Sequence, residues 1–163
     1  MERSPMKTSY FASELNNNRW PQPSEIERYF LAPPGERWFC DTGNDSAGFQ
    51  LKGAEGTAHL KSGWGGRVDI DLQMWGHPTF GVLLIWSKWD GKKSHSFASR
   101  GDLTRLREIV RTTHGDPMPV GLYVPHEVAW KAVKEFLENE GALPRSIEWI
   151  ANEDLPSNTF PAR

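Results

Sequence analysis

The sequence predicts an α+β fold, in which two to three helices pack on a mainly antiparallel sheet of about five to seven strands. Three observations lead to this fold class. Several short segments alternate apolar and polar residues or carry runs of β-branched and aromatic residues, with turn residues between them. One late segment has apolar residues at helical spacing. The length of 163 residues and the apolar content of 37% fit a single hydrophobic core.

The organisation of the chain follows from its composition. We expect residues 1–23 to form a loosely ordered arm, because this stretch is polar and contains three consecutive asparagines and several prolines. Trp20 is expected to pin the end of this arm. Residues 24–155 are expected to form the single domain, and residues 156–163 a polar tail.

The first elements of the domain are short. Ser24 and Glu27 have the spacing of a capping box, in which each side chain satisfies a free backbone N–H of the other residue. This spacing predicts a helix over 24–31. Two short strands are expected next, at 37–40 and 48–52, on either side of turn residues.

The clearest strand is predicted at 68–75, where Val68, Ile70, Leu72 and Met74 alternate with polar neighbours and Trp75. An almost unbroken apolar run at 80–89 then predicts a central strand. Asp90-Gly91 suits a tight hairpin turn, because both residues tolerate positive φ. The returning strand is expected at 94–99.

Helices and strands alternate in the rest of the chain. Asp102 is expected to cap a helix that extends through Val110, and a strand should follow at 120–124. Residues 126–140 carry one apolar stripe and predict the best helix of the chain, with Gly141 at its C-terminal cap. A last strand is expected at 145–150.

The composition excludes several classes of function. The formal charge of −2 comes from 19 basic and 21 acidic residues, so nothing attracts the whole chain to nucleic acid or to an anionic membrane. The longest apolar run, 80–86, is far shorter than the roughly 20 residues that cross a bilayer. The polar N-terminal stretch is unlike a secretory signal, and a single cysteine allows no internal disulfide. These features predict a cytoplasmic protein.

The sequence also lacks a strong catalytic constellation. There is no nucleophile elbow, phosphate-binding loop, zinc-binding helix or C-x-x-C pair, and the five histidines do not have the spacing of metal ligands. Asp69 and Asp71 stand two residues apart and could hold a metal or act as an acid–base pair. The simpler interpretation is the polar face of a strand. We therefore expect no enzymatic activity, no catalytic residue, no metal and no cofactor.

Aromatic residues offer a second kind of site. Most of the eight tryptophans should be core residues, but Trp75 shares the polar strand face and Trp89 flanks a hairpin turn. Both are candidates for contact with a partner. Exposed tryptophans would also suit a small ligand- or carbohydrate-binding module, which is the alternative function.

Acidic residues dominate one region near the C-terminus. Between His126 and Leu155, seven acids stand against three bases, and the last three acids are Glu148, Glu153 and Asp154. Such an acidic surface would complement a basic groove on a partner protein.

The C-terminal half resembles a known family. The pattern consists of GDPMPVGLYVP at 115–125, a helix with Ala129, Ala132, Val133 and Phe136-Leu137, and then Gly141, Pro144 and Ile147-Glu148-Trp149. The stretch Ser99-Arg100-Gly101-Asp102 also fits the family. Over residues 80–155 the chain is similar to immunity protein family 1 of bacterial polymorphic toxin systems.

The resemblance implies a function rather than a set of site residues. Proteins of this family are encoded beside toxins, often zinc-dependent nucleic-acid deaminases, and protect the producing cell by binding the toxin domain. This chain has no H-x-E with P-C-x-x-C and is not itself such a deaminase. We expect it to cover the active site of a cognate toxin domain. The candidate partner-binding residues are Trp75, Trp89, Asp69, Asp71, Glu148, Glu153 and Asp154.

Overall fold

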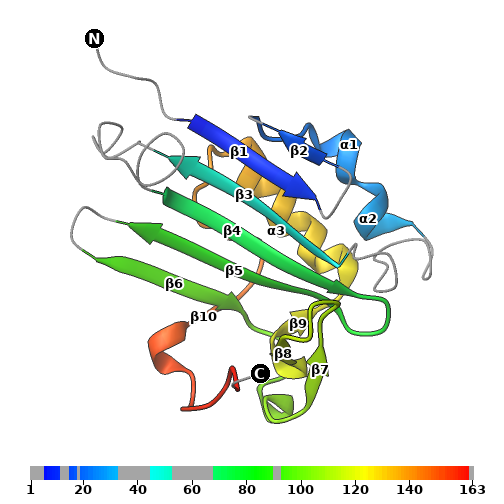
Figure 1. The fold of residues 1–163 in the computed structure, drawn as a ribbon, viewed down its shortest axis with the longest axis vertical. Coiled ribbons are helices and arrows are strands. Elements are labelled where there is room, and N and C mark those ends of the chain that lie inside the picture. The colour runs from blue at the N-terminus through cyan, green and yellow to red at the C-terminus, as the bar shows by residue number, and fades with distance from the viewer. Residues whose placement is uncertain are drawn as a thin grey trace.

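The computed structural model describes residues 6–11, 15–17, 19–32, 45–52, 68–89 and 93–161. These residues build a sheet of antiparallel strands with helices packed on it, so the predicted α+β class is confirmed (Figure 1). From one edge to the other, the sheet runs through β10 (Trp149–Ala151), β6 (Ser94–Ser99), β5 (Gly81–Trp89), β4 (Val68–His77), β3 (Ser46–Lys52), β1 (Met6–Phe11) and β2 (Leu15–Asn17).

Strand β5 lies in the middle of the sheet and has two partners along one of its edges. Its first residues pair with β9 (Tyr123–Val124), with Val82 opposite Val124. Its later residues pair with β6, and Trp89 stands opposite Ser94. The predicted hairpin of 80–89 and 94–99 is confirmed by this pairing. Its turn lies outside the described residues, as does the predicted strand at 37–40.

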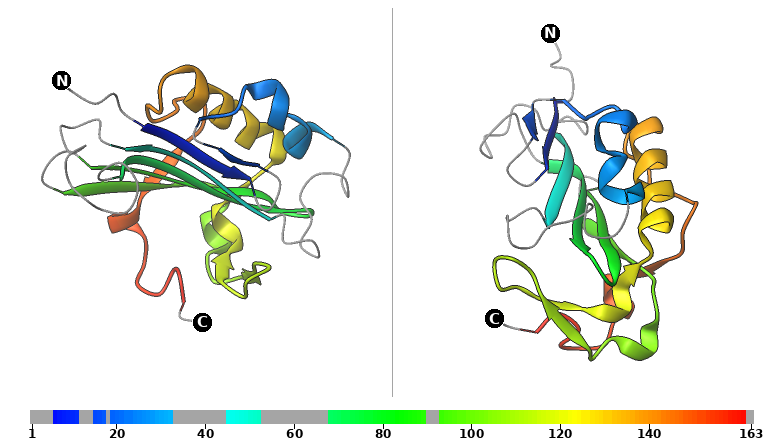
Figure 2. Two further views of the ribbon diagram at one scale, coloured as in Figure 1. Left: turned by 45° about the horizontal axis from the view of Figure 1, so that its top comes forward. Right: turned by 90° about the vertical axis from the view of Figure 1, so that its right-hand side faces the viewer.

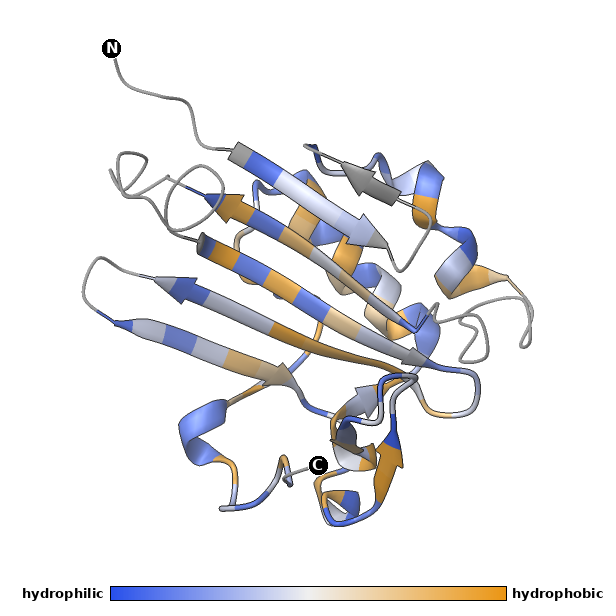
Figure 3. Cartoon of the chain, viewed as in Figure 1, coloured by the Kyte–Doolittle hydropathy of each residue, from blue (hydrophilic) through white to orange (hydrophobic). Residues whose placement is uncertain are grey.

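Alternate residues of the central strands point toward the helices and form the main core. Strand β4 shows the predicted alternation, because Ile70, Leu72 and Met74 are buried against the helices (Figure 3). Phe49 on β3 and Leu84 on β5 belong to the same core and are fully buried. Figure 2 shows the helices gathered on this one face of the sheet.

Helix α3 (His126–Glu138) crosses the sheet and confirms the best helix that the sequence predicts. Its apolar stripe is buried, and the Phe136 ring lies 4.9 Å from that of Trp20 and 6.0 Å from that of Phe49. The helix ends where Glu140 and Gly141 take positive φ values of 55° and 87°. The Gly141 N–H donates to the Phe136 carbonyl over 2.9 Å, which closes the last turn as expected for a C-terminal cap.

The predicted helix at 24–31 is divided into α1 (Pro23–Ile26) and α2 (Arg28–Leu31). The predicted capping pair of Ser24 and Glu27 is wrong, because the pair that forms lies two residues earlier in the chain. The cap is formed by Gln22 and Glu25, whose carboxylate accepts the Gln22 backbone N–H over 3.1 Å. Arg19 fixes the same carboxylate through two contacts of 3.0 Å, and this second partner decides which acid caps the helix.

Part of the N-terminal stretch that we expected to be loosely ordered belongs to the sheet. Strand β1 pairs with β3, with Tyr10 opposite Gly48. The Tyr10 ring occupies the space above this glycine, where any Cβ atom would collide with it. Trp20 pins the end of the stretch as predicted, since it is buried and its Nε1 donates to the Gln50 carbonyl over 3.1 Å.

The stretch from Asp102 to Val124 differs most from the prediction. Asp102 does cap a helix and accepts the Thr104 N–H over 3.0 Å, but this is only the 3₁₀ helix η1 (Leu103–Arg105). The predicted helix through Val110 is wrong, because the β-branched pair Ile109-Val110 belongs to a short hairpin. That hairpin consists of β7 (Ile109–Arg111) and β8 (Pro117–Pro119).

The predicted strand at 120–124 is also shorter than expected. Its first part forms the 3₁₀ helix η2 (Val120–Leu122), and only β9 pairs with the sheet. Gly121 allows η2 to lie close to the start of η1, because a Cβ at this position would lie 2.5 Å from the Asp102 carbonyl oxygen. The two 3₁₀ helices therefore pack backbone against backbone.

This stretch covers part of the sheet face opposite the helices (Figure 2). Leu83 and Ala98 of the sheet meet Met118, Leu122 and Tyr123 there in a second, smaller apolar cluster. The buried Ser99 hydroxyl joins the two layers, since it donates to the Leu122 carbonyl over 2.7 Å and accepts the Leu84 N–H over 2.9 Å.

The last strand, predicted at 145–150, is reduced to β10. The carboxylate of Glu135 on α3 accepts the backbone N–H groups of Arg145 and Ser146, over 2.5 and 3.1 Å. These two residues therefore form a turn beneath the helix and do not join the sheet. The chain leaves β10 directly into the 3₁₀ helix η3 (Asn152–Asp154).

Candidate functional site

The face of the sheet opposite the helices carries polar side chains where the 102–124 stretch does not cover it. Asp71 on β4 stands opposite Gln50 on β3 and Ser87 on β5. The Ser87 hydroxyl in turn contacts the Ser96 hydroxyl on β6 over 2.8 Å. We call this surface the polar face and define it by Tyr10, Gln50, Asp71, Gln73, Ser87 and Ser96.

Asp71 is the acidic centre of the polar face. Burial raises the pKa of Asp71 to about 6. Hydrogen bonds from the Gln50 and Gln73 side chains favour the charged form and partly oppose this rise. The Asp71 Oδ1 atom is buried without a hydrogen-bond partner. The pKa of Tyr10 is raised by burial and by the negative charge of Asp71. A cationic or N–H donor supplied by a partner would satisfy this carboxylate.

Asp69 does not share the environment of Asp71. The pairing register shifts between Leu51 and Lys52, which leaves Asp69 as an extra residue on β4. Such a bulge interrupts the alternation of faces, and Asp69 is only 1% exposed. The two carboxylates therefore do not form an open acid–base pair. Within the part of the chain that the structure describes, no group of three or more His, Cys, Asp or Glu residues could hold a metal ion.

Trp75 and Trp89 point to the same side of the sheet but lie at opposite ends of it. Trp75 stands opposite Leu83 and packs against the second apolar cluster, so it is half-buried. Trp89 is also half-buried, at the hairpin end of β5. Leu83 and Trp89 are six positions apart along β5, which corresponds to about 20 Å. The two indoles thus do not make one continuous stacking platform.

The acidic residues at the C-terminal edge divide into two groups. Glu135 binds the turn at Arg145, and Glu140 pairs with Lys7 over 2.6 Å, so both serve the fold. Glu148, Glu153 and Asp154 are exposed at the two ends of β10, and none of the three forms an ion pair with a described residue. We call these three residues the acidic edge.

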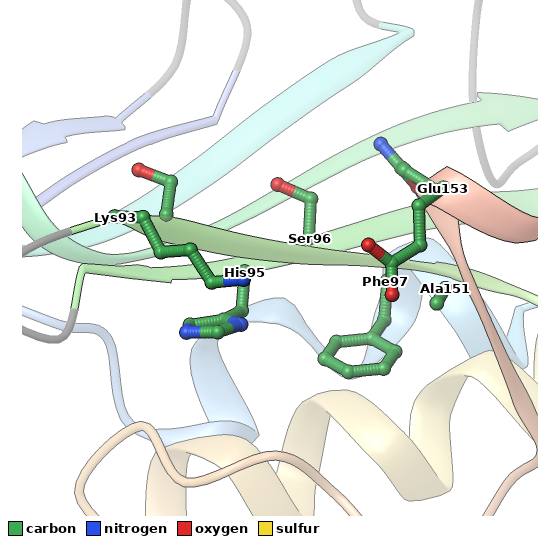
Figure 4. A pocket seen from close by; sticks show the side chains of 8 residues that line it. Lys93, His95, Ser96, Phe97, Ala151 and Glu153 are labelled. Atoms are coloured by element: carbon green, nitrogen blue, oxygen red, sulfur yellow. The ribbon is translucent and has the colours of Figure 1, made fainter.

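A pocket of about 270 Å³ opens beside the acidic edge, between β6 and η3 (Figure 4). His95 and Phe97 point to one side of β6 and Ser96 to the other, while Glu153 approaches from η3. Apart from Glu153, these residues could not be identified as a site from the sequence, because the pocket depends on where β10 ends. It is lined by Lys93, Ser94, His95, Ser96, Phe97, Ala151, Asn152 and Glu153.

Comparison with known proteins connects this fold to a family. No helix among the described residues has the length and apolar character needed to cross a membrane. Comparison with curated proteins and with solved structures gave no match. The family model of immunity protein Imm1 matches residues 41–151, which confirms the resemblance and extends it upstream to β3 and β4. Because the match spans well over half of the sequence, the chain belongs to the Imm1 family of immunity proteins.

Proposed function

We propose that this protein acts in the cytoplasm, where it binds a cognate toxin domain and covers the toxin's active site without catalysing a reaction itself. The single observation that carries the proposal is the Imm1 match over residues 41–151. An immunity protein acts on the toxin that its own cell makes, and a tight stoichiometric complex is enough to block that toxin.

The charges of the acidic edge support a toxin that acts on nucleic acid, with a nucleic-acid deaminase as the specific proposal. A groove that accepts nucleic acid is basic, since it must neutralise phosphates. Glu148, Glu153 and Asp154 are exposed and have no ion-pair partner among the described residues, so their charges remain available. Carboxylates placed opposite such a groove raise the association rate and disfavour wrong partners.

The polar face offers a second contact region in addition to the acidic edge. Asp71 has a buried carboxylate oxygen that lacks a hydrogen bond, and a guanidinium or amide donor from the toxin would supply one. Tyr10 and the serines beside it are residue types that binding surfaces use for adaptable hydrogen bonds. Trp89 at the far end would add an aromatic contact.

Co-expression with the toxin domain encoded beside this gene tests the proposal. We expect growth to be rescued and the two proteins to copurify. With purified proteins, residual toxin activity should fall linearly to zero at one equivalent, because the protein binds and does not turn over. Protection at far below one equivalent would instead indicate a catalytic mechanism. Soluble protein without rescue, and without a complex at micromolar concentration, would contradict the proposal.

A competition experiment tests the position of the complex on the toxin. An inactive variant of the toxin should bind a fluorescent oligonucleotide, and addition of this protein should release the oligonucleotide. If both ligands bind the toxin together, the protein does not cover the active site, although it still binds the toxin.

A further inference from the structure

The outer edge of β6 is only partly occupied by β10. The pairs run from Trp149 opposite Ser99 to Ala151 opposite Phe97, and the chain then turns away into η3. The first half of β6 thus extends beyond its neighbour (Figure 1). Such an edge can accept a strand from another chain.

The register shows which backbone groups point outward along this edge. The Arg100 N–H donates to the Glu148 carbonyl over 3.0 Å, so residue 100 directs its backbone groups toward β10. In an antiparallel ladder the N–H and C=O of one residue point to the same side, and the side alternates from residue to residue. Ser96 and Ser94 therefore direct their N–H and C=O groups outward, at positions about 7 Å apart. The register places Asn152 opposite Ser96, where its N–H meets the Ser96 carbonyl, so the Ser96 N–H and both groups of Ser94 remain for another strand.

The pocket described above lies along this part of the edge. Its far wall includes Asn152, whose side-chain oxygen is buried and has no hydrogen-bond partner. The volume of about 270 Å³ between β6 and η3 leaves room for a short extended backbone (Figure 4). Outward backbone groups of β6 thus line the same pocket as Asn152 of η3.

We propose that an extended segment of the cognate toxin domain pairs with β6 at Ser94 and Ser96 and continues the sheet beyond β10. This inference rests on the proposed function and assigns one part of the binding surface. One residue of the segment exchanges both backbone hydrogen bonds with Ser94, and a carbonyl of the segment two positions away accepts the Ser96 N–H.

Charge favours a toxin segment over a second copy of this chain. Two copies paired along the same edge would be related by a twofold axis and would bring their acidic turns together. Glu153 and Asp154 of each copy would then repel those of the other. A basic toxin surface gains from the same carboxylates. The edge is also too short to hold a dimer alone, because stable interfaces bury about 1,200–2,000 Å².

Amide hydrogen exchange followed by NMR tests the pairing with the unmodified protein. In the free protein, the Ser94 and Ser96 amides should exchange fast, whereas the Phe97 amide, which points toward β5, should be protected. In the toxin complex, we expect exchange at Ser94 and Ser96 to slow by about tenfold or more. A complex that leaves both amides at their free rates would overturn the pairing and leave the immunity function intact.

Two further outcomes would also overturn the inference. If no complex forms with the toxin domain, the pairing and the proposed function both fail. If Ser94 and Ser96 become protected in the protein alone as its concentration rises, the edge binds a second copy instead.

Substitution at residue 96 provides an independent test. Ser96→Pro removes the outward N–H, which the free protein does not use in the β5 ladder, together with the hydroxyl contact to Ser87. Proline is tolerated at such edge positions. We expect toxin binding to weaken by about tenfold. The matched control Ser96→Ala loses the same hydroxyl contact with Ser87 but keeps the N–H, so it measures the effect of the hydroxyl alone and should weaken binding less than Ser96→Pro does. Equal affinities for the two variants, with both folded, would contradict the pairing.

Discussion

The two faces of the sheet are built from alternate residues of the same strands, yet they differ in almost every physical respect. Toward the helices, Phe49, Leu72 and Leu84 are fully buried and belong to one apolar cluster. On the other side, their sequence neighbours Gln50 and Asp71 are polar and half-buried. A small apolar cluster covers only one end of that second face.

This difference separates stability from binding. A single well-packed face is enough to fold a sheet of this kind, so the other face is free to carry groups that cost stability. Substitutions on the helix-covered face should therefore lower the free energy of unfolding, whereas substitutions on the polar face and the acidic edge should change toxin binding. The following predictions test this separation, from the largest expected effect to the smallest.

The largest effect is expected from Phe136→Ala. The ring is fully buried between Trp20 and Phe49, so its loss leaves a cavity in the main core. We expect the free energy of unfolding to fall by about 3–5 kcal/mol in urea denaturation. Leu137→Ala, at the partly buried neighbour, is the control and should cost less. Equal losses would show that the core is not centred on Phe136.

Ser99→Ala should have the next largest effect, because its hydroxyl serves two backbone groups at once. Without it, the Leu84 N–H and the Leu122 carbonyl lose a buried partner. We expect a loss of about 1–3 kcal/mol in the free energy of unfolding. Ser96→Ala removes a half-buried hydroxyl contact on the polar face and should cost less. If Ser96→Ala cost more stability than Ser99→Ala, the proposed difference between the core and the polar face would be wrong.

Asp71 gives a pH-dependent prediction. Its pKa of about 6 in the folded protein exceeds the ordinary value of 3.8, so the folded state binds this proton more tightly than the unfolded chain does. The contribution of Asp71 to stability should therefore fall as pH rises from about 4 to 6 and stay constant above. Asp71→Asn should remove this fall, which is on the order of 2–3 kcal/mol. Denaturation at pH 4 and pH 7 measures it, and parallel profiles for the two proteins would contradict the prediction.

The smallest effect concerns charge. Reversal of Glu153 and Asp154 to Lys should slow association with the toxin by about three- to tenfold at low salt, weaken the salt dependence and change dissociation less. Stopped-flow kinetics at two salt concentrations measures these rates. Reversal of Glu127 and Glu138 to Lys is the matched control, because these two exposed acids lie on α3 at the helix-covered face. If it slows association equally, net charge and not the acidic edge steers the encounter.

Regular patterns in the sequence predicted much of this fold. The alternation in β4, the hairpin of β5 and β6, and the stripe of α3 each agree with their tertiary surroundings. The prediction failed where two patterns overlap. Ile109 and Val110 fit a helical spacing, but pairing with β8 makes them a strand. Strand β1 has no clear alternation of apolar and polar residues, and the fit of the Tyr10 ring over Gly48 becomes visible only in the structure.

The candidate site was less accessible to sequence reasoning. The acidic stretch is visible in the sequence, but the use of Glu135 and Glu140 inside the fold is not. The burial of Asp69 depends on a register shift that no local pattern reveals. The open edge of β6 depends on where β10 ends, because the chain turns from Ala151 directly into η3.

Strands β6 and β9 pair with the same edge of β5, and they should form these pairs at different stages of folding. Strand β6 returns to β5 immediately after Trp89, whereas β9 reaches Val82 only after the whole stretch through Leu122. Closing the longer loop costs more chain entropy, and non-local pairs of this kind form later. We expect the β5–β6 hairpin to be structured in the transition state and the β9 contacts to form after it. Mutations at Val124 should then speed unfolding while leaving the folding rate nearly unchanged.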